Sequence, residues 1–322
     1  MGKHVVVADD PKIDAETFRR VLGDTAEVTV ATLDSKADLR EHGAGADALV
    51  THSESPVTET VLDDLPGLSV LAQSSIGVDN VDVAAAAERD VVVLRSPDYC
   101  LDEVATHAVT LLLACVRNLR TYDQAVRDGE WDWHVGAPLH RFAGSTVGLV
   151  SFGPIARTVA ERLRGFDCDV LAYDPYVDAG EMAEHRVEKV TFAELTERAD
   201  HLSVHAPLTD ETKGLVDADA FDRLRDDAVV VNTGRGGVVD EDDLLDALDA
   251  GELGAAGLDV FEQEPPRDSP LREREDVYLS PHVGWYSEEA MADSNEGVAA
   301  DLARVFDGEE PKGRVDPDAP WA

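Results

Sequence analysis

The fold of this chain is decided by the stretch Val147-Gly148-Leu149-Val150-Ser151-Phe152-Gly153-Pro154-Ile155-Ala156. An apolar, β-branched run breaks at Gly153, and a helical pattern continues over residues 155–164. A second apolar run, residues 169–174, ends in Asp174, at the interval of about 20 residues that separates the glycine turn from the acid in a dinucleotide-binding βαβ unit. In such a unit the pyrophosphate binds at the helix N-terminus and the carboxylate binds the ribose hydroxyls.

The glycine fingerprint of this unit is incomplete. Its three positions are occupied by Ser151, Gly153 and Ala156, so only the middle glycine is present. That glycine is the one at which the backbone approaches the phosphates without a Cβ. Ser151 can form the turn if its φ is negative, and Ala156 is small enough for close helix–strand packing. The alternative interpretation is an ordinary strand–turn–helix in which Asp174, before Pro175, is a turn residue.

Length and composition favour a two-domain protein of the α/β class. A chain of 322 residues is long enough for two buried cores. It has no 18-residue apolar run, which predicts no membrane span, and its first residues enter a strand without room for a signal peptide. The three cysteines form no CxxC pair, as expected of reduced thiols in the cytoplasm.

The chain is strongly acidic. It has 28 Lys and Arg against 67 Asp and Glu, a net charge of −39. Such a surface repels nucleic acids and anionic membranes at ordinary salt. The charge exceeds what solubility requires, and self-repulsion would destabilise the compact state unless salt shortens its range. We therefore expect a salt-adapted protein.

Strands and helices alternate over the first hundred residues, which predicts a parallel sheet covered on both faces. The predicted strands are residues 4–8, 27–31, 48–51, 70–73 and 91–94. The predicted helices are residues 14–22, 35–42, 57–63 and 83–89. An apolar helix is predicted over residues 101–119. Residues 122–143, with Trp131 and Trp133, lack a clean period and are expected either to form an arm over a partner subunit or to pack on their own chain.

A second α/β unit follows. Its predicted strands are residues 145–152, 170–174, 202–205, 228–232, 255–259 and 277–280. A terminal helix over residues 287–306 is expected to fold back onto the first unit. The predicted fold class is therefore α/β with two Rossmann-like domains. A doubly wound dinucleotide-binding sheet (99–290) is inserted into a smaller flavodoxin-like substrate domain (1–98 plus 291–322).

Candidate catalytic side chains follow the later strands, at the edge where open α/β sheets bind ligands. Arg235 offers a planar fork that matches a carboxylate. His282 can exchange a proton near neutral pH, and Glu264 can hold the other imidazole nitrogen. Buried Asp259 is expected to accept a hydrogen bond from a nicotinamide carboxamide. These groups fit the reduction of a 2-keto acid by a nicotinamide cofactor.

With these residues, the chain resembles the D-isomer-specific 2-hydroxyacid dehydrogenase family over nearly its whole length. The matching stretches are Tyr173-Asp174-Pro175, residues 204–209, Asn232-Thr233-Gly234-Arg235-Gly236-Gly237, residues 259–265 and Pro281-His282. Residues 282–290 look most like the C-terminal-binding-protein branch, close to phosphoglycerate dehydrogenases. Ser151 and Ala156 depart from the family pattern.

The resemblance implies specific roles. Arg235, Glu264 and His282 would be catalytic. The cofactor would bind at Gly153, Pro154, Ile155, Asp174, His205, Ala206, Pro207, Thr212, Thr233, Gly234, Arg235, Asp259, His282 and Gly284. The substrate would bind at Ser75, Ile76, Gly77, Arg235, His282 and Trp285, where Trp285 walls the pocket. Asp174 favours NAD(H) over NADP(H), because a carboxylate repels a 2′-phosphate.

The predicted function is the transfer of a hydride between nicotinamide and a small D-2-hydroxy or 2-keto acid. The alternative is an NAD-sensing regulatory or assembly protein of the C-terminal-binding-protein type with little turnover. We expect a cytoplasmic homodimer with no nucleic-acid or membrane partner. His201 and His205 lack a third ligand nearby, so we expect no metal site.

Overall fold

The computed structural model describes residues 2–319. The chain divides into two compact units, which are described separately. Unit 1 is Met1–Cys100 with Ser287–Ala322, and unit 2 is Leu101–Tyr286. From the sequence we expected the substrate domain to comprise residues 1–98 and 291–322, and the NAD-binding domain residues 99–290. Of the expected substrate domain, Met1 and residues 320–322 lie outside the described residues.

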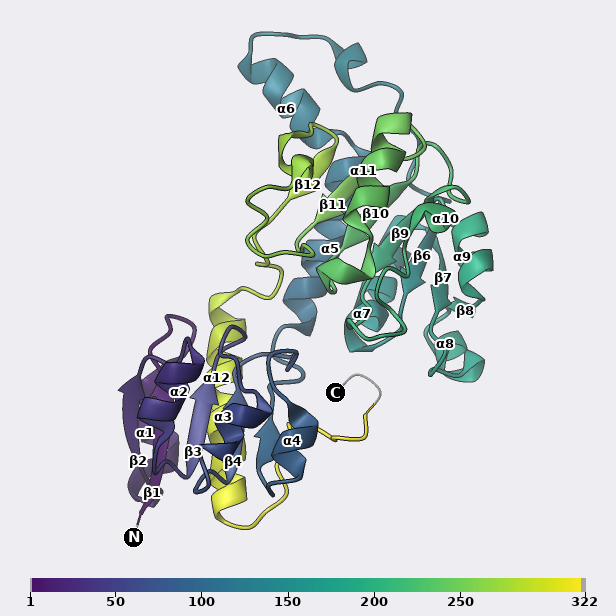
Figure 1. Ribbon diagram of the computed structural model, residues 1–322. Coiled ribbons are helices and arrows are strands. Elements are labelled where there is room, and N and C mark those ends of the chain that lie inside the picture. Colours follow the sequence, from purple (N-terminus) through teal and green to yellow (C-terminus); the bar gives the residue numbers. More distant parts are fainter. Residues whose placement is uncertain (1, 320–322) are drawn as a thin grey trace. The chain divides into compact units, whose positions relative to one another are not determined.

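Unit 1 is built on a five-stranded sheet (Figure 1). The strands are β1 (Lys3–Ala8), β2 (Ala26–Ala31), β3 (Ala48–Thr51), β4 (Val70–Gln73) and β5 (Val92–Leu94). All pair in parallel, in the order β2-β1-β3-β4-β5, which is the flavodoxin-like order. The helices are α1 (Ala15–Leu22), α2 (Lys36–Gly43), α3 (Glu59–Asp63), α4 (Val83–Ala87) and α12 (Glu288–Phe306). Both the fold class and the five strands predicted from the sequence are confirmed.

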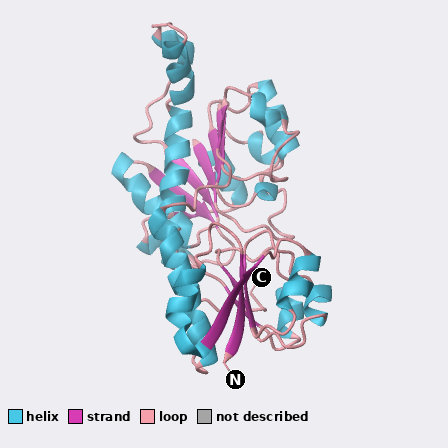
Figure 2. Cartoon of the chain, turned by 90° about the vertical axis from the view of Figure 1, so that its left-hand side faces the viewer, coloured by secondary structure: helices cyan, strands magenta, loops and turns pink. Residues whose placement is uncertain are grey.

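Helices cover both faces of the unit 1 sheet (Figure 2). The central strands β3 and β4 are buried along their whole length, so they read as continuous apolar runs. The last helix, α12, packs against α1, and its Val298, Ala299 and Leu302 belong to the same buried core as Phe18. Burying a valine, leucine or phenylalanine side chain such as Val298, Leu302 or Phe18 contributes about 1.5–3 kcal/mol.

Unit 2 is built on a seven-stranded parallel sheet. The strands are β6 (Thr146–Val150), β7 (Asp169–Tyr173), β8 (Glu188–Lys189), β9 (His201–Val204), β10 (Val229–Asn232), β11 (Ala255–Leu258) and β12 (Val277–Leu279). Their order is β12-β11-β10-β9-β6-β7-β8. Counted from β6, the first six strands have the Rossmann order, and β12 extends the edge. The six strands predicted from the sequence are confirmed, whereas the two-residue β8 was too short to leave a pattern.

The helices of unit 2 depart from expectation at one place. They are α5 (Leu101–Val116), α6 (Leu119–Arg127), α7 (Pro154–Leu163), α8 (Ala179–Glu184), α9 (Phe192–Arg198), α10 (Ala218–Phe221) and α11 (Glu241–Ala250). The helix predicted over 101–119 is confirmed up to Val116, but its end is wrong, because Asn118 adopts a left-handed φ of 46° and separates α5 from α6. Asn tolerates this conformation better than most residues, and its Nδ2 donates to the carbonyl of Gly136 at 2.9 Å.

The segment that follows is partly regular, although the sequence predicted no clean period there. α6 reaches Arg127, and a short 3-10 helix covers Trp133–Gly136. The Tyr122 hydroxyl donates to the carbonyl of Trp133 at 2.9 Å, which ties the returning segment to α6. Trp131 and Trp133 nevertheless remain 91% and 69% exposed. We call residues 119–136 the arm.

Candidate active site

The turn between β6 and α7 differs from the sequence prediction. Ser151 forms the turn with a φ of +76°, so the negative φ that the sequence analysis set as a condition is not required. The first fingerprint position lies in the left-handed region, which costs a residue with a Cβ roughly 1–2 kcal/mol. The Ser151 hydroxyl offsets part of this cost, because it donates to Oδ2 of Asp174 at 3.2 Å. Serine can therefore replace the fingerprint glycine here.

Gly153 lies where a phosphate would approach the backbone. It is the N-cap of α7, and a Cβ added to it would meet no atom within 4 Å. Pro154 occupies the first turn, where a missing N–H is tolerated, and Ile155 follows it. Ala156 is fully buried, as close helix–strand packing requires. A ten-residue helix whose N-terminus faces open space is suited to bind an anion.

Asp174 closes the same turn from the end of β7. Its Oδ2 accepts from the Phe152 N–H at 2.8 Å, and its Oδ1 accepts from the Tyr176 N–H at 2.8 Å. The residue is only 7% exposed. The carboxylate therefore orients the glycine turn. Oδ2 also accepts from the Ser151 hydroxyl, whereas Oδ1 has a further lone pair with which it can accept from a hydroxyl.

Further predicted cofactor residues, among them His205, Thr233 and Gly234, directly follow β9 and β10 and lie together at the carboxyl ends of those strands. His205 is hydrogen-bonded between two hydroxyls, Ser203 Oγ at 2.9 Å and Thr233 Oγ1 at 3.3 Å. Burial lowers the pKa of His205 to about 4, so its ring is neutral at pH 7. A Cβ on Gly234 would lie 2.8 Å from the carbonyl oxygen of Ala206, so glycine permits the two loops to touch.

The loop after β9 is closed by a threonine. The Thr212 hydroxyl donates to the carbonyl of Pro207 at 2.5 Å, and it accepts from the Thr209 N–H at 2.8 Å. Thr212 thus shapes the backbone that starts at Pro207. In the described residues it touches the loop itself, so its predicted contact with a cofactor stays a prediction.

Arg235 follows β10 on a loop held by Asn232. The Asn232 side chain accepts from the Gly234 N–H at 3.0 Å and donates to the carbonyl of Arg235 at 3.0 Å. A Cβ on the next residue, Gly236, would lie 1.8 Å from the carbonyl carbon of Phe261. Only glycine allows this contact, which brings the Arg235 loop against the loop after β11.

Glu264 and His282 form a direct pair. Oε2 of Glu264 lies 2.8 Å from Nδ1 of His282, and Oε1 accepts from the Phe261 N–H at 3.1 Å. Burial disfavours the charged carboxylate, but the hydrogen bond and charge of His282, together with the charge of Arg235, hold the pKa of Glu264 below its usual value. The structure thus brings together the three predicted catalytic groups around the Glu264 carboxylate.

The loop that carries His282 is anchored on Asp259. The Asp259 carbonyl accepts from the His282 N–H at 2.7 Å, and its carboxylate accepts from the N–H groups of Val283 at 2.9 Å and Gly284 at 2.8 Å. These bonds support His282 in a left-handed conformation with a φ of 50°. A Cβ on Gly284 would lie 2.8 Å from Oδ2 of Asp259, so the loop requires glycine there.

The surroundings of Asp259 include a residue that the sequence analysis missed. Burial opposes its charge, but hydrogen bonds from His107, Ser280, Val283 and Gly284 outweigh it and lower the pKa of Asp259 to about 2. Since the carboxylate already receives these donors, its main observed role is to hold the loop. Its predicted contact with the nicotinamide stays a prediction. His107 lies far away in the sequence, on α5, and no local pattern marked it.

Trp285 completes this end of unit 2. Its indole Nε1 donates to the carbonyl of His282 at 2.9 Å, and its ring packs edge-on against Tyr286 with centroids 5.5 Å apart. The indole is thereby fixed beside the His282 backbone. An aromatic wall in this position is compatible with the predicted pocket role.

In unit 1 the predicted substrate loop follows β4. The Ser75 hydroxyl donates to the carbonyl of Gly77 at 2.7 Å, and Arg95 donates to the carbonyl of Ile76 at 3.2 Å. Among the bonds described for residues 2–319, the N–H groups of Ser75, Ile76 and Gly77 donate to no protein acceptor. Such a turn is suited to receive a carboxylate.

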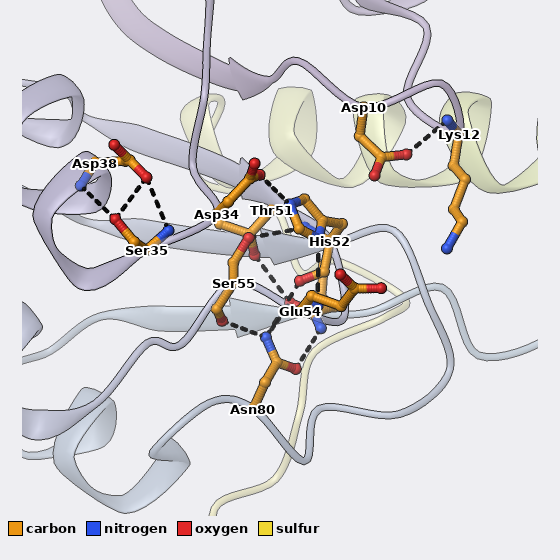
Figure 3. Close-up of polar contacts among 11 residues, drawn as sticks. Asp10, Lys12, Asp34, Ser35, Asp38, Thr51, His52, Glu54, Ser55 and Asn80 are labelled. Atoms are coloured by element: carbon orange, nitrogen blue, oxygen red, sulfur yellow. Dashed lines mark hydrogen bonds and ion pairs between the residues drawn. The ribbon is translucent and has the colours of Figure 1, made fainter. Parts of the chain in front are cut away.

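A polar network holds this loop to the one after β3 (Figure 3). The Asn80 amide donates to the carbonyls of His52 at 3.2 Å and Ser55 at 2.6 Å, and Gln73 donates to Asn80 at 2.6 Å. His52 is engaged at both ring nitrogens, by Asp34 at 3.0 Å and by the Glu54 N–H at 3.2 Å. The network stiffens the carboxyl-terminal edge of the unit 1 sheet.

Other kinds of site find no support in the described part of the chain. Across residues 2–319, no three His, Cys, Asp or Glu side chains gather closely enough to hold a metal ion. His201 is committed to structure, since its Nδ1 accepts from the Val229 N–H at 3.2 Å. No helix in the same residues has the length and apolar character needed to cross a bilayer.

Comparison with known proteins agrees with this geometry. Residues 109–284 match the family described as D-isomer specific 2-hydroxyacid dehydrogenase, NAD binding domain. The chain is 39% identical over 295 residues to a D-3-phosphoglycerate dehydrogenase of Mycobacterium leprae, covering 92% of this chain and 56% of that protein. It is 38% identical over 285 residues to a glyoxylate reductase of Korarchaeum cryptofilum, covering 87% and 86%.

Solved structures show the same fold. The TT0316 protein of Thermus thermophilus superposes with a TM-score of 0.88 at 30% identity, covering 97% of this chain and all of that one. The chain spans about half the length of the phosphoglycerate dehydrogenases it matches and most of the glyoxylate reductase. Because the NAD-binding domain of this family matches more than half of the chain, and the glyoxylate reductase is 38% identical over most of both chains, this protein belongs to the D-isomer-specific 2-hydroxyacid dehydrogenase family.

Proposed function

We propose that the protein is an NAD(H)-dependent oxidoreductase that interconverts a small 2-keto acid and its D-2-hydroxy acid. The observation that carries this proposal is the 2.8 Å contact between Glu264 and His282, with the charge of Arg235 acting on the same carboxylate. A cation, a proton donor and a partner for that donor are what carbonyl reduction beside a carboxylate requires.

Each residue has one task in the proposed reaction. Arg235 binds the substrate carboxylate through its planar guanidinium. His282 gives the proton on Nε2 to the carbonyl oxygen, and Glu264 stabilises the cationic ring before the transfer. A bound nicotinamide supplies the hydride that C2 receives, so one keto acid, one NADH and one proton yield one hydroxy acid and NAD⁺.

The test is oxidation of NADH against a panel of 2-keto acids that includes glyoxylate, hydroxypyruvate, phosphohydroxypyruvate and aromatic members. Turnover of at least one is expected. Tight NADH binding with no turnover of any would support the alternative, a regulatory or assembly protein of the C-terminal-binding-protein type. The intact catalytic groups favour the enzyme.

A single methyl group at Gly153 should separate cofactor binding from folding. In Gly153→Ala we expect NADH affinity to fall at least about tenfold, because the methyl group occupies the space in which the pyrophosphate approaches the helix N-terminus. The melting temperature should hold, since the φ of −73° suits alanine and no protein atom lies within 4 Å. Isothermal titration with NADH measures the effect, and Gly165→Ala, also in open space, is the matched control. Equal affinity in both variants would contradict the assignment.

We further propose that NAD(H) is preferred over NADP(H). Oδ1 of Asp174 keeps a lone pair for a ribose hydroxyl, while a 2′-phosphate would face the negative charge of the carboxylate. A lower KM for NADPH than for NADH would contradict this proposal. We also propose that the indole of Trp285, held by its bond to the His282 carbonyl, forms an uncharged wall of the substrate pocket, as the resemblance to the C-terminal-binding-protein branch implies.

A homodimer formed through the arm is the proposed assembly. In the described chain the arm exposes Trp131, Trp133 and Leu119, at 91%, 69% and 60%. Exposed apolar side chains gathered on one projecting segment are typical of a protein interface. Light scattering should give twice the monomer mass, and Trp131→Asp with Trp133→Asp should return the monomer. A wild-type monomer at micromolar concentration would exclude this assembly.

Adaptation to high salt is proposed from the charge of −39. The melting temperature is expected to rise between about 0.1 M and about 3 M KCl, because salt reduces the Debye length to roughly 3 Å at 1 M and screens the self-repulsion. A flat or falling melting temperature would contradict it. A cytoplasmic location is proposed with it, since all three cysteines are free thiols, two of them buried.

A further inference from the structure

The loop that presents His282 is connected to α5 through a chain of three side chains. Oγ of Ser280 lies 2.6 Å from Oδ1 of Asp259, and Nε2 of His107 lies 2.8 Å from the same Oγ. A serine hydroxyl has one proton, and the Asp259 carboxylate can only accept. The Ser280 proton is therefore given to Asp259, and His107 Nε2–H donates to Ser280.

His107 also acts on Asp259 directly. Its Nε2 lies 3.4 Å from Oδ1, and the Asp259 side chain is only 4% exposed, so this contact is little screened by water. A Cβ placed on Gly284 would lie 3.3 Å from Cδ2 of His107, so the imidazole ring is also packed against the loop. His107 thus contacts both the anchor of the loop and the loop itself.

We propose that His107 is a positioning residue for the catalytic histidine, acting through Ser280 and Asp259. The inference rests on the proposed function. The Asp259 carbonyl accepts from the N–H of His282, and its carboxylate accepts from the N–H groups of Val283 and Gly284. His107 supplies a donor that keeps the carboxylate aimed at Val283 and Gly284. Without that donor the carboxylate would be held less firmly, and so would the loop that keeps His282 in its left-handed conformation.

The test compares His107→Leu with His107→Gln in the whole protein. Leucine fills the space without a donor, whereas the amide nitrogen of glutamine can donate to Ser280. His201→Gln is the matched control, because His201 is also a hydrogen-bonded ring but lies at the start of β9, away from the carboxyl ends of the strands. Amide hydrogen exchange of residues 280–286 is measured first, since it needs neither substrate nor turnover.

We expect His107→Leu to speed exchange at Val283 and Gly284 at least about tenfold, the effect of one lost hydrogen bond to a charged group. It should lower kcat by a similar factor while the KM for NADH changes less than about threefold. His107→Gln should restore most of both, and His201→Gln should alter neither.

The opposing results are equally specific. Unchanged exchange in His107→Leu, or faster exchange with an unchanged kcat, would overturn the positioning role. So would a kcat loss that His107→Gln fails to restore, because the donor would then not be what matters. If the wild-type protein reduces no 2-keto acid, the proposed function fails, and the exchange experiment alone decides whether His107 holds the loop.

Discussion

Replacement of His282 by alanine is expected to lower kcat for 2-keto acid reduction by a factor of about 10²–10⁴, the range that a positioned general acid contributes. The physical reason is the loss of the only proton donor held by Glu264 in the described site, at 2.8 Å. NADH affinity should change little, because the cofactor turn at Gly153 is untouched. Steady-state kinetics with the best substrate of the panel, together with NADH titration, measures both quantities.

The control for this variant is His140→Ala. His140 is also paired with a carboxylate, Asp227 at 3.5 Å, but its side chain is 66% exposed. Its removal should leave kcat within about twofold, since exposed ion pairs contribute little. A His282→Ala protein that turns over like the wild type would remove the catalytic role assigned to this histidine.

Glu264→Gln refines the same prediction. The pKa of Glu264 is held below its usual value, so the carboxylate stays charged through the neutral range. In the wild-type protein this charge is lost only as pH falls through the lowered pKa of Glu264, so kcat should decline on the acid side. Glutamine carries no charge at any pH, so the variant should have a lower kcat at neutral pH and should lack that acid-side decline. A pH profile identical to that of the wild type would show that Glu264 only shapes the loop.

Replacement of Arg235 by alanine is the second large effect expected. We expect kcat/KM to fall by on the order of 10²–10³, because truncating one partner of a hydrogen-bonded charge pair costs about 2–5 kcal/mol. The loss should appear mainly in the KM for the keto acid, and Arg235→Lys should recover only part of it, since a lysine cannot form the two parallel hydrogen bonds. Kinetics at varied keto acid concentration makes the measurement.

Arg225→Ala is the matched control for Arg235→Ala. Arg225 is 61% exposed and pairs with Asp227 at 3.0 Å, on the loop that leads into β10. Its removal should leave kcat/KM unchanged. If Arg235→Ala bound and reduced the substrate normally, the carboxylate would have to be held elsewhere, and the turn at Ser75–Gly77 would be the next place to test.

The alternation of apolar strands and helical patterns was enough to predict both parallel sheets. Fully buried strands such as β3 and β10 read as continuous apolar runs, and their spacing leaves room only for helical crossovers. The candidate catalytic residues followed from this, because the carboxyl ends of parallel strands meet at one edge of a sheet. Arg235, Glu264 and His282 could therefore be grouped before any contact was seen.

Where a local pattern was ambiguous, the prediction failed. The apolar period continues past Val116, yet the helix breaks at Asn118, whose side chain finds a partner at Gly136. The positive φ of Ser151 was not foreseen, for a similar reason. A serine disfavours the left-handed region unless something holds it there, and the Asp174 carboxylate that does so lies on the next strand.

The sequence by itself determined the two sheets, the strand ends and the residue types that gather there, because periodicity and burial are properties of neighbouring residues. Only the tertiary structure decided how those residues are held. The hydrogen bond between His107 and Ser280 joins α5 to the end of β12. The sequence around either residue gives no sign of the other. Long-range hydrogen bonds of this kind leave no local pattern, since each partner is chosen by the packing of the whole unit.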